Sequence, residues 1–169
     1  MTKKTNLSES PRETIDGAGY KIGIVVSKWN DKITNALLKG AKSTLDAAGV
    51  DEEDIRVVEV PGSFEIPVAL KMLLQSESLD GVIGLGCVIK GETSHNEYIN
   101  QAVANGITQL SIMSGKPCVF GVLTPNSMEQ AEDRAGGKHG NKGDEAANTV
   151  LSMIALKKSL AEPKSNIGY

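Results

Sequence analysis

The sequence predicts an α/β protein, a three-layer sandwich in which a central, mainly parallel four-stranded sheet has helices on both faces. Four short apolar runs are rich in Val and Ile and do not alternate strictly with polar residues, as is typical of strands covered on both sides. Segments with apolar residues at helical spacing separate these runs, and such alternation indicates a parallel sheet. The length of 169 residues is that of a single domain.

The four expected strands are short, and each is followed by a turn or a polar segment. The first apolar run extends over Lys21–Ser27 and the second over Ile55–Val60. The third run is Gly81–Ile89 and the fourth is Pro117–Thr124. Their lengths are those of ordinary strands and are too short for buried helices.

The expected helices are marked by apolar residues three and four positions apart. The first begins after Asn30 or Asp31 and ends before Gly49, which suits the left-handed residue after a helix. The last one carries Lys157 and Lys158 in its final turn, where positive charge is favourable. The resulting order of elements indicates a flavodoxin-like winding of the sheet. The expected helices cover residues 31–48, 66–75, 94–114, 128–135 and 144–158.

The two ends of the chain lie outside this pattern. Residues 1–20 are polar and patternless, so we expect an N-terminal arm that is mobile or adds a segment to a sheet edge. The domain itself is expected to span residues 21–158, and a loose tail is expected at residues 159–169. The sequence shows no internal repeat and no second domain.

Charge and composition argue against several classes of protein. Lys and Arg number 18 against 21 Asp and Glu, a net charge of −3, which supplies no basic face for nucleic acid. No apolar run approaches the roughly 18 residues of a membrane span, and the first residues lack the apolar segment of a secretion signal. The 2 cysteines cannot form a disulfide framework, so we expect a reduced, cytoplasmic protein.

Unusual residues follow three of the four expected strands. Trp29, the only tryptophan, comes just after the first strand. Phe64 lies in a Pro-Gly turn after the second strand, and His95 follows the third. In open α/β sheets, ligands bind outside the carboxyl ends of the strands. The sequence therefore predicts a ligand pocket at this edge of the sheet.

These residues have both functional and structural interpretations. Trp29 could stack on a planar heterocycle, or it could cover the helix beneath it as an aromatic at the rim. Phe64 could contact a ligand, although its position slightly favours a plug between the sheet and a helix. Glu65 could accept hydrogen bonds from ligand hydroxyls, or it could complement the dipole of the second helix.

The segment Gly91–Ser94 immediately precedes an expected helix. Free backbone N–H groups and two hydroxyls at such a place suit a phosphate, but ordinary capping explains Thr93 or Ser94 equally well. His95 lies in the first helical turn, where the positive helix end would keep its imidazole neutral and able to act as a base. A surface histidine is the simpler alternative. Neither a dinucleotide fingerprint nor a P-loop is present.

The connection Ala135–Gly143 is rich in glycine, which indicates unusual backbone angles or close contacts. Arg134 at its edge could bind an anion or could balance the end of a helix. No spacing of Cys and His matches a zinc site, so no metal is expected. Cys87 and Cys118 fall in strands and are expected to be buried, inert thiols.

Together these segments resemble the 6,7-dimethyl-8-ribityllumazine synthase family of riboflavin biosynthesis. The resemblance covers about residues 20–158 and implies condensation of 5-amino-6-(D-ribitylamino)uracil with 3,4-dihydroxy-2-butanone 4-phosphate, with no metal or organic cofactor. Two other functions stay open: a riboflavin synthase that dismutates the lumazine, and a flavin- or lumazine-binding cage or storage protein with little catalysis. The matching segments are Lys21–Val26, Trp29–Asp31, Pro61–Pro67, Gly86–His95, Phe120–Thr124 and Arg134–Gly143.

The resemblance also implies the roles of individual residues. His95 would be the acid/base catalyst. Phe120 and Arg134 match positions that a neighbouring subunit supplies in this family, although the strand position of Phe120 by itself predicts a core residue. The residues implied to bind the ribitylaminouracil are Trp29, Ser63, Phe64, Glu65, Cys87, Val88, Ile89 and Phe120. Those implied to bind the butanone phosphate are Glu92, Thr93, Arg134 and Lys142.

The family resemblance also implies an assembly. Its members form pentamers, and in some of them twelve pentamers build a hollow 60-subunit shell. The Gly-rich connection here is of the short kind without an insertion, which favours the shell. The expected partners are small-molecule substrates, further copies of the chain and, as a possible associate, riboflavin synthase. No nucleic-acid or membrane partner is expected.

Overall fold

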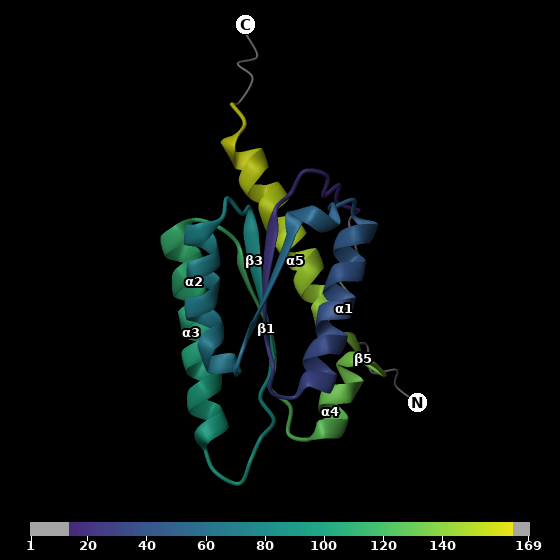
Figure 1. Ribbon diagram of the computed structural model, residues 1–169, viewed down its shortest axis with the longest axis vertical. Helices are drawn as coiled ribbons and strands as arrows, with labels where there is room; N and C mark the ends of the chain where they lie inside the picture. Colours follow the sequence, from purple (N-terminus) through teal and green to yellow (C-terminus); the bar gives the residue numbers. More distant parts are fainter. Residues whose placement is uncertain (1–13, 164–169) are drawn as a thin grey trace, which may run out of the picture.

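The structure is a computed structural model that describes residues 14–163 (Figure 1). Its centre is a four-stranded parallel sheet with the strand order β2-β1-β3-β4. The strands are β1 (Ile22–Ser27), β2 (Ile55–Val60), β3 (Gly81–Cys87) and β4 (Cys118–Leu123). Helices cover both faces, so the predicted three-layer α/β sandwich is confirmed, and the strand order is that of flavodoxin-like winding.

The helices divide between the two faces of the sheet, as Figure 1 shows. One face is covered by α1 (Asp31–Ala47) and α5 (Lys142–Ala161), and the other by α2 (Ile66–Ser76) and α3 (His95–Ser114). Each face has its own apolar cluster of buried side chains. The shorter helical segments are α4 (Met128–Asp133), η1 (Glu52–Asp54) and η2 (Ser63–Glu65).

The two central strands are buried throughout. All residues of β1 and β3 are buried, which explains why their sequences are apolar runs without alternation. Close packing against the helices requires a glycine in β3. A Cβ atom at Gly84 would lie 2.5 Å from Cγ2 of Ile66, so the missing side chain lets α2 approach the sheet.

Glycine also sets the distance between the two helices on the other face. Gly143, in the first turn of α5, lies against the backbone of α1, where an added Cβ would overlap the carbonyl oxygen of Leu37. The helix pair is further fixed by Asn141, whose Nδ2 donates to the carbonyl of Ala36 at 3.0 Å. The Gly-rich connection therefore includes a close backbone contact, one of the two interpretations that the sequence allowed.

The last helix differs from the predicted one at both ends. It begins at Lys142 rather than Asp144, and it ends at Ala161, so it includes the first residues of the predicted tail. The earlier start is explained by capping, because Oδ1 of Asn141 accepts a hydrogen bond from the N–H of Gly143 at 2.7 Å.

A small antiparallel ribbon within the Gly-rich connection was not predicted. It consists of β5 (Ala135–Gly137) and β6 (Gly140–Asn141). Gly136 and Gly140 have φ values of 103° and 80°, which lie in the region that favours glycine, and the chain can therefore reverse within a few residues. The preceding helix, α4, ends at Asp133, two residues earlier than expected.

The described part of the predicted arm packs against the domain. The N–H of Gly17 donates to the carbonyl of Ala48 at 2.7 Å, and Tyr20 is buried. The ammonium group of Lys158 lies 4.2 Å from the centroid of the Tyr20 ring. Residues 14–20 are thus a packed coil without a strand, while residues 1–13 and 164–169 lie outside the described residues. Within the described residues, no helix is long and apolar enough to cross a membrane.

Candidate active site

The parallel strands bring most of the predicted site residues to one edge. In Figure 1 the strands end at the lower end of the molecule, where α1, α2 and α3 begin. Trp29 follows β1, Ser63–Glu65 follow β2 as the segment η2, and His95 opens α3 after β3. The edge predicted from the sequence is therefore the place where these side chains gather.

Trp29 presents its indole to solvent at this edge. The side chain is 68% exposed, and its backbone N–H donates to the carbonyl of Pro61 at 3.1 Å. The indole rests on the turn after β2, because a Cβ atom at Gly62 would lie 2.7 Å from its Cε3 and Cζ3 atoms. An exposed ring supported on one side can stack on a planar ligand with the other.

Asn30, beside Trp29, has a role that the sequence did not reveal. It occupies the N-cap position of α1, one of the two residues expected there, but its side chain makes no capping hydrogen bond. Instead, its Nδ2 donates to the carbonyl of Cys87 at 2.9 Å and ties the end of β1 to the end of β3. Its backbone is left-handed, with φ of 60°, a conformation that asparagine tolerates better than most residues. That tolerance was the only available signal.

Phe64 does not plug the space between sheet and helix, so the slightly favoured structural interpretation is wrong. Its side chain is 57% exposed, because it lies on the outer side of η2 while Ser63 is buried. The neighbouring carboxylate of Glu65 closes the turn by accepting a hydrogen bond from the N–H of Gly62 at 2.9 Å through Oε2. The aromatic ring is thus available for contact with a ligand or another subunit.

Unsatisfied polar atoms concentrate at the same edge. Two of these atoms are the hydroxyl oxygens of Ser27 and Ser63, which lie on either side of Gly86. A Cβ atom added at Gly86 would collide with Oγ of Ser63 and lie 3.3 Å from Oγ of Ser27. Buried polar atoms without partners are costly, so bound water or a polar ligand is expected there. Within residues 14–163, the buried side-chain atoms that lack a hydrogen-bond partner are Ser27 Oγ, Ser63 Oγ, Asn96 Oδ1 and Asn100 Oδ1.

The backbone after β3 is only partly free to contact a ligand. The N–H of Val88 donates to the carbonyl of Leu123 at 2.8 Å, and the carbonyl of Cys87 is occupied by Asn30. Among the residues that the structure describes, the N–H of Ile89 has no backbone partner. Cys87 is buried as predicted, and burial raises the pKa of its thiol to about 11, which disfavours the reactive thiolate.

The loop before α3 leaves its polar groups open. Glu92, Thr93 and His95 are all exposed, and Ser94 occupies the N-cap position without a side-chain capping bond. Ordinary capping, the structural alternative for this segment, therefore does not occupy these hydroxyls. The positive end of a 20-residue helix and two free hydroxyls remain available to an anion.

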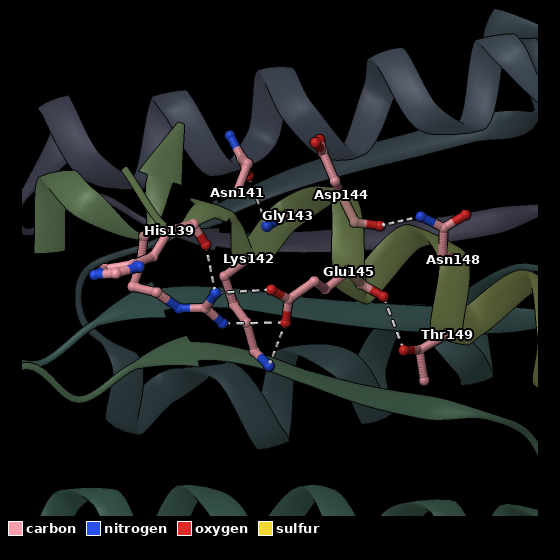
Figure 2. A network of polar contacts seen from close by, with 9 residues as sticks. His139, Asn141, Lys142, Gly143, Asp144, Glu145, Asn148 and Thr149 are labelled. Atoms are coloured by element: carbon pink, nitrogen blue, oxygen red, sulfur yellow. Dashed lines mark hydrogen bonds and ion pairs between the residues drawn. The ribbon is translucent and has the colours of Figure 1, made fainter. Parts of the chain in front are cut away.

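Arg134 lies in a second group of predicted residues, at the end of α4. Its Nη1 lies 2.9 Å from Oε1 of Glu145, and its Nη2 donates to Oε2 at 3.1 Å. Lys142 lies 3.2 Å from the same carboxylate, and Figure 2 shows these contacts at the start of α5. Glu145 was not singled out from the sequence, although its i,i+3 spacing from Lys142 was visible.

Glu145 is held as an anion by its two basic neighbours. Burial by itself would raise the pKa of the carboxyl group. Hydrogen bonds from Arg134 and Lys142, together with their positive charges, outweigh burial and lower the pKa below its ordinary value. The three side chains therefore form a cluster with one net positive charge at neutral pH.

Phe120 belongs to this second group and is half-buried, so the core position expected from its strand holds only in part: the ring packs against one apolar cluster but is not enclosed by it. It lines a cavity of about 370 Å³ beside the edge strand β4, together with Lys142 and Glu145. No residue of the carboxyl edge lines this cavity. Nor does a hydrogen bond or ion pair join the two groups within residues 14–163. The structure thus separates the predicted site residues into two places on one chain.

None of the described residues forms a metal site. In residues 14–163, no group of three or more His, Cys, Asp or Glu side chains is placed to hold a metal ion. The other cysteine, Cys118, is half-buried rather than buried as expected. It is a free thiol whose pKa is raised by burial, with hydrogen bonds from serines acting in the opposite direction.

The fold is a doubly wound α/β fold, and its carboxyl edge carries an exposed aromatic ring and unsatisfied polar groups. These features are typical of α/β proteins that bind small molecules. Comparisons with known proteins identify its family. The family model described as 6,7-dimethyl-8-ribityllumazine synthase matches residues 19–158. The chain therefore belongs to the 6,7-dimethyl-8-ribityllumazine synthase family and is a transferase of riboflavin biosynthesis.

Curated relatives support this assignment over nearly the full chain. The 6,7-dimethyl-8-ribityllumazine synthase of Parabacteroides distasonis is 49% identical over 154 residues, which cover 90% of this chain and 96% of the relative. The enzyme of the same name from Bacteroides fragilis is 50% identical over 140 residues, covering 83% of this chain and 98% of the relative. The enzyme of the same name from Cytophaga hutchinsonii is 47% identical over 150 residues, which cover 89% of this chain and 94% of the relative.

Proposed function

We propose that the protein condenses 5-amino-6-(D-ribitylamino)uracil with 3,4-dihydroxy-2-butanone 4-phosphate to give 6,7-dimethyl-8-ribityllumazine. The amine attacks the ketone, and one water leaves as the imine forms. Phosphate is then eliminated, and ring closure releases a second water, so that the atoms balance. The observation that carries this proposal is the open indole of Trp29 beside buried hydroxyls without partners.

The pyrimidine substrate binds at the carboxyl edge. Its ring stacks on Trp29, and its edge is read by the free backbone N–H of Ile89. The ribityl chain carries several hydroxyls, which suit the unsatisfied Oγ of Ser63 and the carboxylate of Glu65. Phe64 closes over the ring from the exposed side of η2, and Cys87 and Val88 contribute the floor of the site.

The phosphate of the second substrate binds between the loop before α3 and the basic cluster of a neighbouring subunit. Thr93 and Glu92 lie in that loop, and the free N–H groups at the start of α3 favour an anion. Arg134 and Lys142 are supplied by the neighbour, together with Phe120. This arrangement is supported by the separation of the two groups on one chain, since no hydrogen bond or ion pair joins them within residues 14–163.

His95 moves the protons of the reaction. It is exposed at the first residue of α3, next to the phosphate loop, where it can take a proton from the attacking amine and assist the departure of phosphate. Much of the remaining acceleration comes from holding two substrates together in one site. No metal or organic cofactor takes part in these steps.

A site shared between subunits requires an assembly. We propose a homopentamer and, from the short Gly-rich connection, a 60-subunit shell, with riboflavin synthase as an associated enzyme. Exposed apolar side chains on α3, such as Ile112 and Met113, support burial against further subunits. The cytoplasm is the proposed location, supported by the two free thiols.

The test is to incubate the purified protein with both substrates and record the fluorescence of the lumazine product. We expect product only when both are present, and none with the dephosphorylated butanone. Binding of the lumazine without turnover would contradict the proposal and indicate a storage shell instead. Lumazine consumed to give riboflavin, with no need for the butanone phosphate, would indicate the synthase that acts on lumazine.

The shared site can be tested separately by complementation. The variants His95→Ala and Arg134→Ala should each be inactive or nearly so. Co-expressed in one cell, they should regain about a quarter of the wild-type activity, because random assembly restores both residues at about one interface in four. No regain of activity in mixed assemblies would show that each subunit carries its own complete site.

A further inference from the structure

The hydrogen bonds of Arg134 all involve one part of its guanidinium group. Nη1 faces Oε1 of Glu145 at 2.9 Å and donates to the carbonyl of His139 at 2.7 Å. Nη2 donates to Oε2 of Glu145 at 3.1 Å. Of the five N–H groups of a guanidinium, the two hydrogen bonds use one on Nη1 and one on Nη2, and the ion pair with Oε1 of Glu145 is a further close contact of Nη1. The N–H of Nε and the second N–H of Nη2 have no partner among residues 14–163.

We propose that Glu145 is a positioning residue that holds Arg134 so that this free Nε/Nη2 edge faces the phosphate of the substrate. Two adjacent, parallel N–H groups are the arrangement that binds two oxygens of one phosphate. The inference rests on the proposed function, in which Arg134 binds that phosphate. It adds a residue that acts through Arg134 without touching the substrate.

The contacts favour positioning over competition. A carboxylate that competed with phosphate would occupy the edge that phosphate needs, whereas Glu145 occupies the end formed by Nη1 and Nη2. Lys142, 3.2 Å from Oε2, balances part of the carboxylate charge, so the cluster keeps a net positive charge. The side chains of Arg134 and Glu145 are each roughly 30% exposed, so solvent reaches the ion pair.

The ribbon β5–β6 supplies the third anchor. The carbonyl of His139 lies in its turn, between Gly136 and Gly140, whose left-handed backbones shape the reversal. Figure 2 shows the dashed contacts that join His139 and Glu145 to the same guanidinium group. The glycines of this connection therefore serve to aim a backbone carbonyl at the guanidinium group of Arg134.

The test compares Glu145→Ala with the matched control Asp144→Ala, which removes an acid one residue away that makes no contact with Arg134. Binding of inorganic phosphate is measured by calorimetry, and KM is measured for each substrate. For Glu145→Ala we expect about a three- to tenfold weaker phosphate affinity and a similar rise in KM for the butanone phosphate, because the arginine must be ordered on binding. The KM for the ribitylaminouracil and the Asp144→Ala values should stay at wild-type level.

A double-mutant comparison tests whether Glu145 affects phosphate binding through Arg134. In an Arg134→Ala background, Glu145→Ala should cause no further loss, since its effect passes through the missing side chain. Equal or tighter phosphate binding by Glu145→Ala, or a loss that adds to that of Arg134→Ala, would overturn the inference. Unchanged phosphate binding in Arg134→Ala alone would instead overturn the proposed phosphate site. If the alanine variant does not fold, Glu145→Gln serves, with a smaller loss expected because one acceptor is kept.

Discussion

Replacing Gly62 with alanine should displace the indole of Trp29 and weaken binding of the proposed pyrimidine substrate. The added Cβ would lie 2.7 Å from Cε3 and Cζ3 of the ring. Favourable carbon contacts are about 3.5–4.0 Å long, so the indole must move by about 1 Å. The backbone of Gly62 is extended, with φ of −133° and ψ of 178°, so alanine is accommodated there without backbone strain.

The size of the effect follows from the stacking energy. Aromatic stacking contributes about 0.5–1.5 kcal/mol beyond area burial, and losing most of it corresponds to an affinity about two- to tenfold lower. The assay is direct, since Trp29 is the only tryptophan and its fluorescence reports on ligand stacking. Titration of the ribitylaminouracil into wild type and Gly62→Ala gives both dissociation constants.

The control is the same substitution in a chain that lacks the indole. In a Trp29→Ala background, Gly62→Ala should change the dissociation constant much less, because the indole is absent and the remaining close neighbour, Oε2 of Glu65 at 3.2 Å, need shift by only a few tenths of an ångström. If Gly62→Ala binds the pyrimidine as tightly as wild type and with unchanged tryptophan emission, the indole does not rest on this turn as described. The stacking role of Trp29 would then lose its structural support.

Three other predictions concern catalysis, packing and pH. His95→Ala should lower kcat by about 10²–10⁴-fold with substrate dissociation constants retained, and wild-type turnover would rule out the acid/base role. Gly143→Ala should destabilise the fold by about 1–3 kcal/mol, because its Cβ overlaps the Leu37 carbonyl; an unchanged urea midpoint would contradict this packing. The pKa of Glu145 is lowered by folding, so its stabilising contribution is complete above the ordinary value of 4.5 and is lost as the pH falls through the lowered value. The difference in free energy of unfolding between wild type and Glu145→Gln, measured by urea unfolding, should therefore shrink as the pH falls below 4.5. A difference that stays constant over this pH range would contradict the ion pair.

Much of the fold could be predicted because apolar patterns record which surfaces are buried. The runs in β1 and β3 lack alternation since both faces of these strands are covered, and the structure buries every residue in them. The ends of elements were less predictable. Asn141 moved the start of α5 and the glycine angles produced β5 and β6, both through local hydrogen bonds and turns that leave little trace in a hydrophobic pattern.

The candidate site was predictable where it depends on strand ends. Parallel strands end at one edge, so Trp29 and His95 could be placed there from their positions in the chain. The two phenylalanines were harder, because aromatic residues near strands are usually buried. Phe64 is exposed and Phe120 is only half-buried beside the free edge of β4, which reflects surfaces that one chain leaves uncovered.

The sequence by itself determined the order of the main strands and helices, the edge at which the candidate site residues gather and the resemblance to one enzyme family, because each of these depends on residues near one another in the chain. Only the tertiary structure revealed that Asn30 reaches the carbonyl of Cys87 and that Glu145 holds Arg134 with one edge free. Such contacts join segments whose distance in space is set by how helices and strands pack, and no local pattern encodes that distance.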